Sequence, residues 1–373
     1  MIDRRRFLEG AFVSAASAVL PWSASAAPSG RPGGAIVIDG QGSMADPYSN
    51  ENATIFSARA LAEHQASGIT ALSMTIALVG NEPDNYHKSI EAMAQFDEAL
   101  ADNPHAFVKV LTAAEIVEAK RVGRIAIILN TQDTALVGTE LDRLSVLKGL
   151  GVRVVQLTYN SRNLSGDGCL EPSNAGLSKL GHATIERIEH EKLLLDLSHS
   201  GQRTTAEAIA AATRPPTISH TGCRALNDNP RNQWDAELKT CADKGGVVGV
   251  YWMPFLVADG KPTGSDLVRH MEHVRQVCGE DHVAIGTDGI VPKTVIDDKS
   301  RAEQKKFYND RAKRGIAAPG EGPDIFNIVA EWDDSGRFAH LADGLARAGW
   351  RSATIDKALG ANLLRLYRQA WGA

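Results

Sequence analysis

Eight short apolar runs alternate with helix-like segments along the chain. Most of these runs are nearly continuous stretches of Val, Ile and Leu, which is typical of parallel strands buried on both faces. They lie at residues 35–40, 70–78, 124–132, 152–160, 192–200, 216–221, 246–252 and 282–289. Eight strand–helix repeats predict a (β/α)8 barrel of the α/β class, with a doubly wound open sheet as the alternative.

The segments between the runs carry helical signals. Residues 140–151 place three leucines near one face and end in glycines, and residues 204–213 and 264–277 also indicate helices. The dinucleotide-binding pattern Gly-x-Gly-x-x-Gly does not follow the first run, so a dinucleotide site has no support.

Two stretches depart from the repeat. Residues 80–113 predict an extra helix and an extra short strand. Residues 291–335 are charged and then rich in Gly and Pro, which predicts an insertion after the eighth strand that serves as a lid, an oligomer arm or a mobile segment. Amphipathic C-terminal helices follow, the last of them near residues 360–371.

The first 26 residues have the pattern of an export signal. Arg4 and Arg5 precede Phe-Leu, an apolar stretch follows, and the small residues Ala-Ser-Ala stand at 24–26. This resembles a Tat-type signal peptide, and the apolar stretch is too short for a comfortable membrane span. We therefore expect use of the Tat export machinery, a periplasmic location and a single barrel domain over residues 27–373. A Sec signal or an uncleaved anchor is the alternative.

The charge and composition of the chain limit the classes of binding partner that it suits. The formal net charge is -5, from 40 basic and 45 acidic residues, and no basic run argues for nucleic acid. No later stretch of the sequence reads as a membrane span. The four cysteines form no Cys-x-x-Cys pair, and sequence alone does not pair them.

Polar residues stand where the predicted strands end, which is where the chemistry of such barrels gathers. His199 and His220 end the fifth and sixth runs, and Asp288 ends the eighth. One strand-end histidine is more often structural than functional, but two on adjacent strands with a nearby aspartate favour a metal site. Neutral imidazoles and a carboxylate suit zinc.

Several motifs together closely resemble the renal (membrane) dipeptidases, a metallopeptidase family among the amidohydrolase-like barrels. They are "DLSHSG" at 196–201, "SHTG" at 219–222 with "NPRN" after it, and "HVAIGTDG" at 282–289. Residues 151–181 and the C-terminal "LGANLLRLY" fit the same family. The resemblance covers roughly residues 35–290 and the last helix. It implies a (β/α)8 barrel with two zinc ions and a bridging water that cleaves dipeptides.

The resemblance also implies roles for four residues. His199 and His220 match the two histidines of one zinc ion. Asp288 matches the carboxylate of the eighth strand, which contacts the other zinc ion and handles the proton. Arg231 matches the arginine that binds the substrate carboxylate, a task that suits its planar, bidentate guanidinium.

Four positions depart from the family pattern. Gln41 and Ser43 stand where the family has a His-x-Asp pair, and Gln132 stands in place of the bridging glutamate. Tyr159 replaces the histidine that stabilises the tetrahedral intermediate, although a tyrosine can still donate a hydrogen bond to an oxyanion. These departures predict one zinc ion rather than two, held by the two histidines and the aspartate of the eighth strand.

We therefore predict a periplasmic, metal-dependent hydrolase that cleaves a dipeptide or another small amide with a free carboxylate, using a zinc-activated water. Asp288 is expected to act as the base and Tyr159 to hold the oxyanion. Arg231, Tyr159 and Asn160 are expected to bind the substrate. The resemblance also suggests a homodimer.

The sequence leaves two other hypotheses for the function of the barrel. The barrel could have lost hydrolysis and instead bind, or help to mature, a small periplasmic peptide. A weaker hypothesis is metal-free chemistry by Tyr159 and Asp288.

Overall fold

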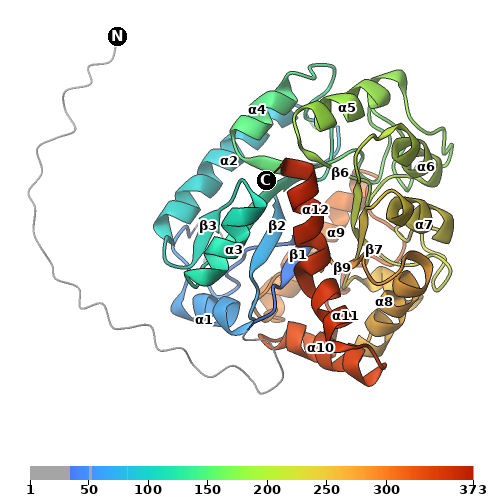
Figure 1. Ribbon diagram of the computed structural model, residues 1–373. Coiled ribbons are helices and arrows are strands. Elements are labelled where there is room, and N and C mark those ends of the chain that lie inside the picture. The colour runs from blue at the N-terminus through green and yellow to red at the C-terminus, as the bar shows by residue number, and fades with distance from the viewer. Residues whose placement is uncertain (1–33, 50–52, 82, 373) are drawn as a thin grey trace, which may run out of the picture.

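The computed structural model describes residues 34–49, 53–81 and 83–372, and its centre is a closed barrel of eight parallel strands (Figure 1). The expected signal peptide at 1–26 lies outside the described residues. The barrel strands are β1 (Ile38–Gly42), β2 (Ala71–Thr75), β4 (Ile125–Thr131), β5 (Val152–Gln156), β6 (Leu194–Asp196), β7 (Thr217–Thr221), β8 (Val247–Val250) and β9 (Val283–Ile285). Because β1 pairs with β9 and β2 pairs with β4, the sheet closes on itself. The predicted (β/α)8 barrel is confirmed.

A ninth strand, β3 (Phe107–Lys109), lies beside the start of β4. β3 pairs with the first part of one edge of β4. β5 pairs with the later part of the same edge, beginning at Leu129. The helix α2 (Asn85–Asp102) precedes β3. The extra helix and the extra strand expected within residues 80–113 are therefore both present.

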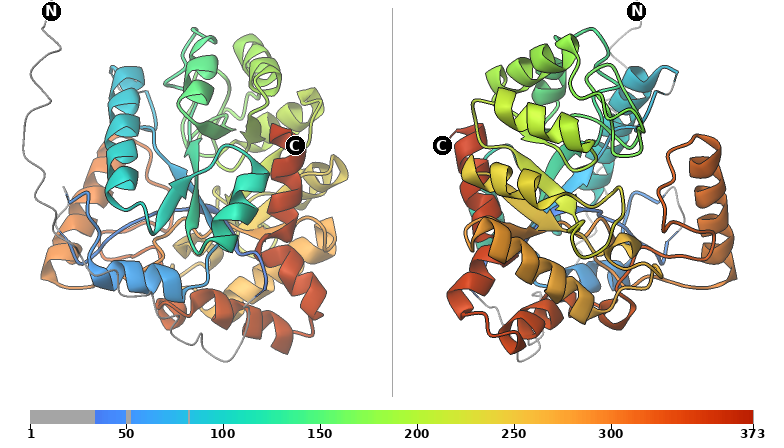
Figure 2. Two further views of the ribbon diagram at one scale, coloured as in Figure 1. Left: turned by 60° about the vertical axis from the view of Figure 1, so that its left-hand side comes forward. Right: turned by 90° about the vertical axis from the view of Figure 1, so that its right-hand side faces the viewer.

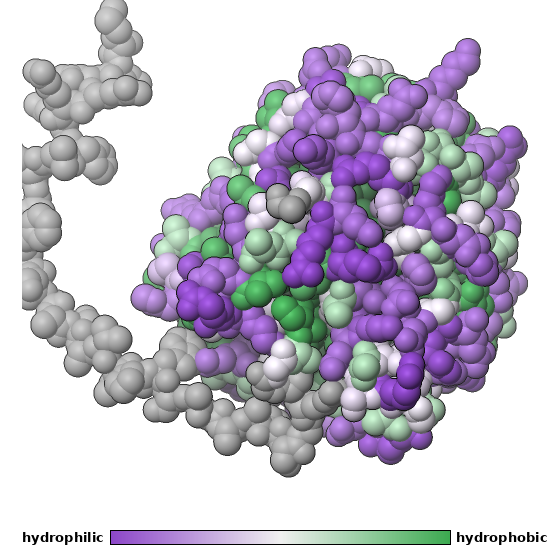
Figure 3. Space-filling model, in the orientation of Figure 1, coloured by the Kyte–Doolittle hydropathy of each residue, from purple (hydrophilic) through white to green (hydrophobic). Residues whose placement is uncertain are grey.

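A ring of helices covers the outside of the barrel, and each helix buries an apolar stripe against the strands. They are α1 (Ala58–Ala66), α3 (Ala113–Arg121), α4 (Arg143–Gly149), α5 (Lys179–His190), α6 (Gln202–Ala211), α7 (Asp235–Asp243) and α8 (Gly264–Cys278), with a short 3-10 turn, η1 (Pro254–Leu256), before α8. On the face of the molecule that Figure 3 shows, the surface is largely hydrophilic and apolar side chains lie only in small groups. No helix in the described part of the chain is long and apolar enough to cross a membrane.

The last helix closes the amino end of the barrel. The chain ends in α10 (Arg337–Arg347), α11 (Ser352–Asp356), the π-helical turn η3 (Lys357–Ala361) and α12 (Asn362–Trp371). Leu363, Leu366 and Tyr367 of α12 share a buried cluster with the barrel residues Ile38, Val154, Leu194, Val247 and Ala284. This end is therefore filled with apolar side chains, and the opposite end is left for the site.

The segment 291–335 forms the expected insertion after the last strand. It contains α9 (Asp298–Lys313) and the 3-10 turn η2 (Ala330–Trp332). Figure 2 shows α9 standing away from the ring of helices, on the opposite side of the barrel from α12. Arg311 is the single buried residue of α9 in the described chain, so this helix is mostly solvated.

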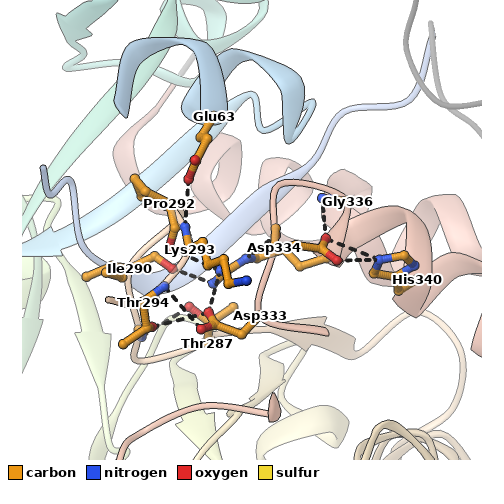
Figure 4. Close-up of polar contacts among 12 residues, drawn as sticks. Glu63, Thr287, Ile290, Pro292, Lys293, Thr294, Asp333, Asp334, Gly336 and His340 are labelled. Atoms are coloured by element: carbon orange, nitrogen blue, oxygen red, sulfur yellow. Dashed lines mark hydrogen bonds and ion pairs between the residues drawn. The ribbon is translucent and has the colours of Figure 1, made fainter. Parts of the chain in front are cut away.

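A buried ion pair joins the two ends of the insertion. Arg337 Nη2 lies 2.9 Å from Asp333 Oδ1, and both side chains are buried. Arg337 also donates to the carbonyl oxygens of Ile290 and Pro292, and the backbone N–H of Thr294 donates to Asp333 (Figure 4). The start and the end of the insertion are therefore held at one place beside β9.

Replacing Arg337 should destabilise the whole protein. Arg337→Met leaves the carboxylate of Asp333 buried without its cation, so we expect a loss of roughly 3–5 kcal/mol in the free energy of unfolding. Urea denaturation followed by circular dichroism measures it. Arg347→Met is the matched control, because Arg347 is exposed on the same helix and its loss should stay within about 0.5 kcal/mol. Equal losses for the two variants would contradict the role of the ion pair.

Candidate functional site

A cavity of about 290 Å³ lies at the carboxyl end of the barrel. It is lined by Val79, Gln132, Tyr159, His199, Arg231, Met253, Phe255, Asp288, Phe307, Arg311, Glu321 and Asn327. Five of these residues, namely Gln132, Tyr159, His199, Arg231 and Asp288, were singled out from the sequence. The barrel therefore brings most of the predicted site residues to one place, and their chemical roles stay predictions.

The two histidines are in direct contact. Nε2 of His199 lies 2.9 Å from Nε2 of His220, and both side chains are buried. The other ring nitrogen of each is also engaged, with Asn160 Oδ1 at 2.6 Å from His199 Nδ1 and Ser219 Oγ at 2.8 Å from His220 Nδ1. Burial lowers the pKa of both histidines well below the usual range, with the positive charge of Arg231 acting in the same direction, so both rings are neutral.

The buried carboxylate of Asp196 fixes the positions of the residues next to the two histidines. It accepts hydrogen bonds from the hydroxyls of Ser198 and Ser219 and from their backbone N–H groups. These serines directly precede His199 and His220, so the ends of β6 and β7 are tied to one buried group. Sequence reasoning missed this network, although the Ser-His repeat at both strand ends was the signal that could have revealed it.

Asn160 lies behind His199 and does not line the cavity. Its Oδ1 accepts from His199 Nδ1, and its Nδ2 donates to the carbonyl oxygen of Ile316 at 2.7 Å. Asn160 is completely buried. This position suits orientation of the imidazole rather than the contact with substrate that was predicted for Asn160.

Arg231 is a buried cation in the wall of the cavity. Only 2% of the residue is exposed, and Nη1 donates to the carbonyl oxygen of Ser198 at 2.8 Å. Nη2 lies 3.0 Å from His199 Nε2. Among the described residues Arg231 forms no ion pair with a carboxylate, although the charge of Asp288 acts on it within the same cavity. The positive charge in the wall favours an anionic ligand.

The insertion contributes a second arginine that sequence reasoning missed. Arg311 of α9 donates to the hydroxyl of Tyr159 at 2.9 Å and forms a two-point ion pair with Glu321, with N–O distances of 2.6 and 2.8 Å. The ring of Tyr159 stacks on His199 with centroids 4.2 Å apart. Nothing distinguishes Arg311 from the other charged residues of its helix in the sequence, so no local signal could have identified it.

Two carboxylates line the cavity, and Asp288 has fewer hydrogen-bond partners than Glu321. Its backbone has a positive φ of 55°, and its backbone N–H donates to the carbonyl oxygen of Gln41 at 2.7 Å. Burial raises the pKa of Asp288 to about 6, while Arg231, Arg311 and a hydrogen bond with Gln132 oppose the rise. Asp288 is therefore a carboxylate at neutral pH that accepts a proton readily.

The two substituted positions of the first strand lie outside this cavity. The amide of Gln41 donates to Thr75 Oγ1 at 3.0 Å and accepts from Asn130 Nδ2 at 2.9 Å. Ser43 is half-buried and lines a neighbouring cavity of about 220 Å³, whose lining shares Asp288 with the first cavity. Both polar groups of the Gln41 amide are therefore engaged by neighbouring side chains.

The three-ligand zinc site expected from the sequence is not assembled. The described residues contain no group of three or more His, Cys, Asp or Glu side chains that could hold a metal ion, so Asp288 does not complete a set with the two histidines. In addition, Nε2 of His199 already contacts Arg231. The residues that the structure describes therefore do not provide the three protein ligands expected for a zinc ion.

The chain is similar to known proteins both in sequence and in structure. Dipeptidase verJ of Clonostachys rogersoniana is 30% identical over 179 residues, which cover 48% of this chain and 46% of verJ, so the match spans less than half of that relative. The crystal structure of an amidohydrolase from Pseudomonas aeruginosa is 28% identical, with a TM-score of 0.76 over 91% of this chain and 97% of that one.

A metallopeptidase from Rhodobacter sphaeroides, solved with a phosphinate mimic of the dipeptide L-Ala-D-Ala, shares the fold. Its TM-score is 0.73 at 17% identity, over 91% of this chain and 100% of that one. The profile of the membrane dipeptidase family matches residues 44–303, a range that includes both histidines, Arg231 and Asp288. The chain therefore belongs to the membrane dipeptidase family, peptidase family M19.

Proposed function

We propose that the protein is a hydrolase that cleaves a dipeptide or another small amide with a free carboxylate. Membership of the family supports metal-dependent hydrolysis of dipeptides at the family level and implies a metal cofactor, generally zinc. Because the described residues contain no complete group of ligands for that ion, we assign chemical roles only to the side chains of this chain. The single zinc ion expected from the sequence stays a prediction.

The observation that carries the proposal is the buried guanidinium of Arg231. It faces a cavity of about 290 Å³ and has no carboxylate partner among the described residues. A substrate carboxylate would neutralise this charge and accept two parallel N–H bonds. The cavity lies at the small end of the range for ligand sites, which supports a small substrate.

The other side chains of the cavity suit hydrolysis of an amide. Asp288 takes a proton from the water that attacks the carbonyl carbon, and it passes this proton to the amine as the C–N bond breaks. The hydroxyl of Tyr159 accepts a hydrogen bond from Arg311, so its own O–H is free to donate to the oxyanion. Burial raises the pKa of Tyr159, which keeps this proton in place at neutral pH.

A second candidate function is binding, or help in the maturation, of a small peptide without hydrolysis. It is favoured by the uncharged network in which Gln41, at a position where the family pattern has a metal ligand, hydrogen-bonds with Thr75 and Asn130. The same cavity and the same arginine would then hold the peptide.

The location of the protein is a separate proposal. The twin-arginine pattern within residues 1–26 supports export through the Tat machinery to the periplasm. A homodimer remains an expectation from the resemblance.

The carboxylate clamp can be tested with matched substrates. We expect the purified protein to release amino acids from dipeptides and to act far more slowly on the same dipeptides with an amidated C-terminus. Arg231→Gln should raise KM about thirtyfold or more, because truncating one partner of a buried charge pair costs roughly 2 kcal/mol or more. Mass spectrometry of the products gives the rates.

Arg224→Gln is the control for this experiment. Arg224 lies on the same loop but stacks on Trp234 and pairs with Asp228, outside the cavity, so its replacement should leave KM unchanged. Equal rates for free and amidated dipeptides would refute the clamp. Tight binding of a dipeptide without turnover would select the second candidate function.

The role of Asp288 predicts a pH profile. The carboxylate form is the base and is present above its pKa of about 6, so kcat/KM should fall about tenfold per pH unit below that value. Asp288→Asn should lower kcat by about 10²–10⁴-fold. Asp281→Asn, at the exposed amino end of β9, serves as the control. A kcat/KM that stays flat down to pH 4 would exclude Asp288 as the base.

A further inference from the structure

A second cavity, of about 220 Å³, adjoins the first one, because the linings of the two share Asp288 and Asn327. Of the two cavities, Arg231 lines only the first. The proposed function places the substrate carboxylate on Arg231 and the scissile amide at Asp288. The half of the amide that lies beyond the scissile bond therefore enters the second cavity.

The walls of the second cavity are largely apolar. Trp252 and Trp332 meet edge to face, with ring centroids 6.0 Å apart, and Trp252 is only 3% exposed. A wall of this kind favours an aliphatic or aromatic group, and it makes the removal of water from an ammonium group costly. The apolar residues of the lining are Trp252, Ile290, Phe326, Ile328, Val329 and Trp332.

The indole of Trp252 adds a hydrogen-bond donor to this lining. Its Nε1 is buried and has no hydrogen-bond partner in the described part of the chain. An indole N–H donates and cannot accept, so it stabilises an oxygen atom of a ligand but not an ammonium group. This wall therefore suits an uncharged ligand better than a cation.

The two carboxylates that line the second cavity are both in use. Asp333 pairs with Arg337 at 2.9 Å and accepts hydrogen bonds from the backbone N–H and the hydroxyl of Thr294, at 3.1 and 3.2 Å (Figure 4). Asp288 acts on the positive charge of Arg231, and the proposed function uses it to take the proton of water. Neither carboxylate is therefore a spare partner for a cation of the ligand.

Two further polar residues of the lining, Ser43 and Asn327, carry no charge. Asn327 lies where the two cavities meet, and Ser43 stands where the family pattern has an aspartate. In a dipeptide the ammonium group is one carbon atom away from the scissile carbonyl, so it would lie at this junction. The described lining offers an amide and a hydroxyl there but no further carboxylate.

From these contacts we propose that the second cavity selects an uncharged acyl group, so that the preferred substrate is an N-acyl amino acid with an aliphatic acyl chain. The reaction is the same hydrolysis: water adds to the carbonyl carbon, the C–N bond breaks, and one proton of the water goes to the amine that leaves. The products are a carboxylic acid and an amino acid. The order of the two halves in the site rests on the proposed function, whereas the selection against an ammonium group rests on the lining of the second cavity.

Two substrates that differ in a single group test this selection. N-hexanoyl-alanine and norleucyl-alanine share the same carbon skeleton, and only the second carries an α-ammonium group. We expect kcat/KM of the wild type at pH 7 to be about tenfold higher or more for N-hexanoyl-alanine, because the ammonium group loses water without gaining a carboxylate partner. Mass spectrometry of the released alanine gives both rates.

The same ratio should depend on pH through the substrate. The α-amino group loses its proton with a pKa of about 8, so norleucyl-alanine loses this positive charge as the pH rises from 7 to 9. The advantage of N-hexanoyl-alanine should therefore shrink several-fold over this range. The charged side chains of the lining that face this amine are Asp288, Asp333 and Arg337. Changes in the enzyme that affect both substrates alike cancel in the ratio.

A carboxylate at the junction should weaken the selection. Asn327→Asp changes the amide to a carboxylate of the same shape, so it should lower the ratio about tenfold by stabilising the ammonium group of norleucyl-alanine. Asn309→Asp is the matched control, because Asn309 is exposed on α9 and lines neither cavity. Its ratio should match that of the wild type.

Two results would overturn the proposal. One is a kcat/KM for norleucyl-alanine at pH 7 that equals or exceeds the value for N-hexanoyl-alanine in the wild type. The other is an advantage of N-hexanoyl-alanine that changes neither with pH nor in Asn327→Asp, because shape rather than charge would then explain it. If Asn327→Asp fails to fold, as circular dichroism would show, the pH dependence of the wild type decides alone.

The test separates this proposal from the proposed function. If neither compound is cleaved, the hydrolase is disproved, and calorimetric binding of the same two compounds decides whether the cavity selects the uncharged acyl group. If both are cleaved and norleucyl-alanine is the faster, the hydrolase stands and the selection is disproved.

Discussion

The carboxylate of Asp196 holds together the two strands on which the site is built. It gathers the hydroxyl and backbone N–H groups of Ser198 and Ser219, so the ends of β6 and β7 take fixed positions relative to each other. His199 and His220 follow these serines, and their contact depends on this arrangement. Arg231 in turn donates to the carbonyl oxygen of Ser198, so its guanidinium is aligned by the same segment. A buried carboxylate that is fully hydrogen-bonded acts here as a rigid connector.

The barrel was predictable because its signal is spread over many residues. Eight runs of Val, Ile and Leu must be covered on both faces, which parallel sheets flanked by helices achieve, and eight strand–helix repeats favour the closed form. The extra helix and strand before β4 were visible for the same reason. The gathering of His199 and Asp288 at one cavity also followed from the rule that strand ends meet, whereas Arg231 was expected there from the family resemblance alone. These predictions depend on patterns along the chain rather than on single contacts.

The parts that escaped prediction depend on single contacts between distant residues. Arg311 lies in a helix of mostly exposed, charged residues, and only the path of the insertion brings it to Tyr159. Asn160 follows an apolar strand, as a substrate ligand would, yet its amide is taken by His199 and Ile316. Gln41, Ser43 and Gln132 predicted a site reduced to one zinc ion, and the described residues contain no group of three or more His, Cys, Asp or Glu side chains that could hold a metal ion. The sequence did not predict that the side chain of Arg231 contacts His199.

The positive charge of a buried arginine differs chemically from that of a metal ion. A guanidinium stays charged at every accessible pH and binds carboxylates in a fixed plane, but it does not lower the pKa of a bound water. Asp288, whose pKa is about 6, suits a base near neutral pH. The second arginine, Arg311, is neutralised by Glu321 and so polarises Tyr159 without adding net charge.

The ion pair between Arg337 and Asp333 makes the insertion a closed loop whose two ends share one anchor. Because the entropy of closing such a loop changes only slowly with its length, residues between the ends can be lengthened, shortened or exchanged at little thermodynamic cost to the barrel. Phe307, Arg311 and Glu321 all lie on this loop and all line the cavity. Evolution could therefore replace one wall of the pocket as a unit, and a chimaera made at this anchor would carry a relative's substrate preference in a single exchange.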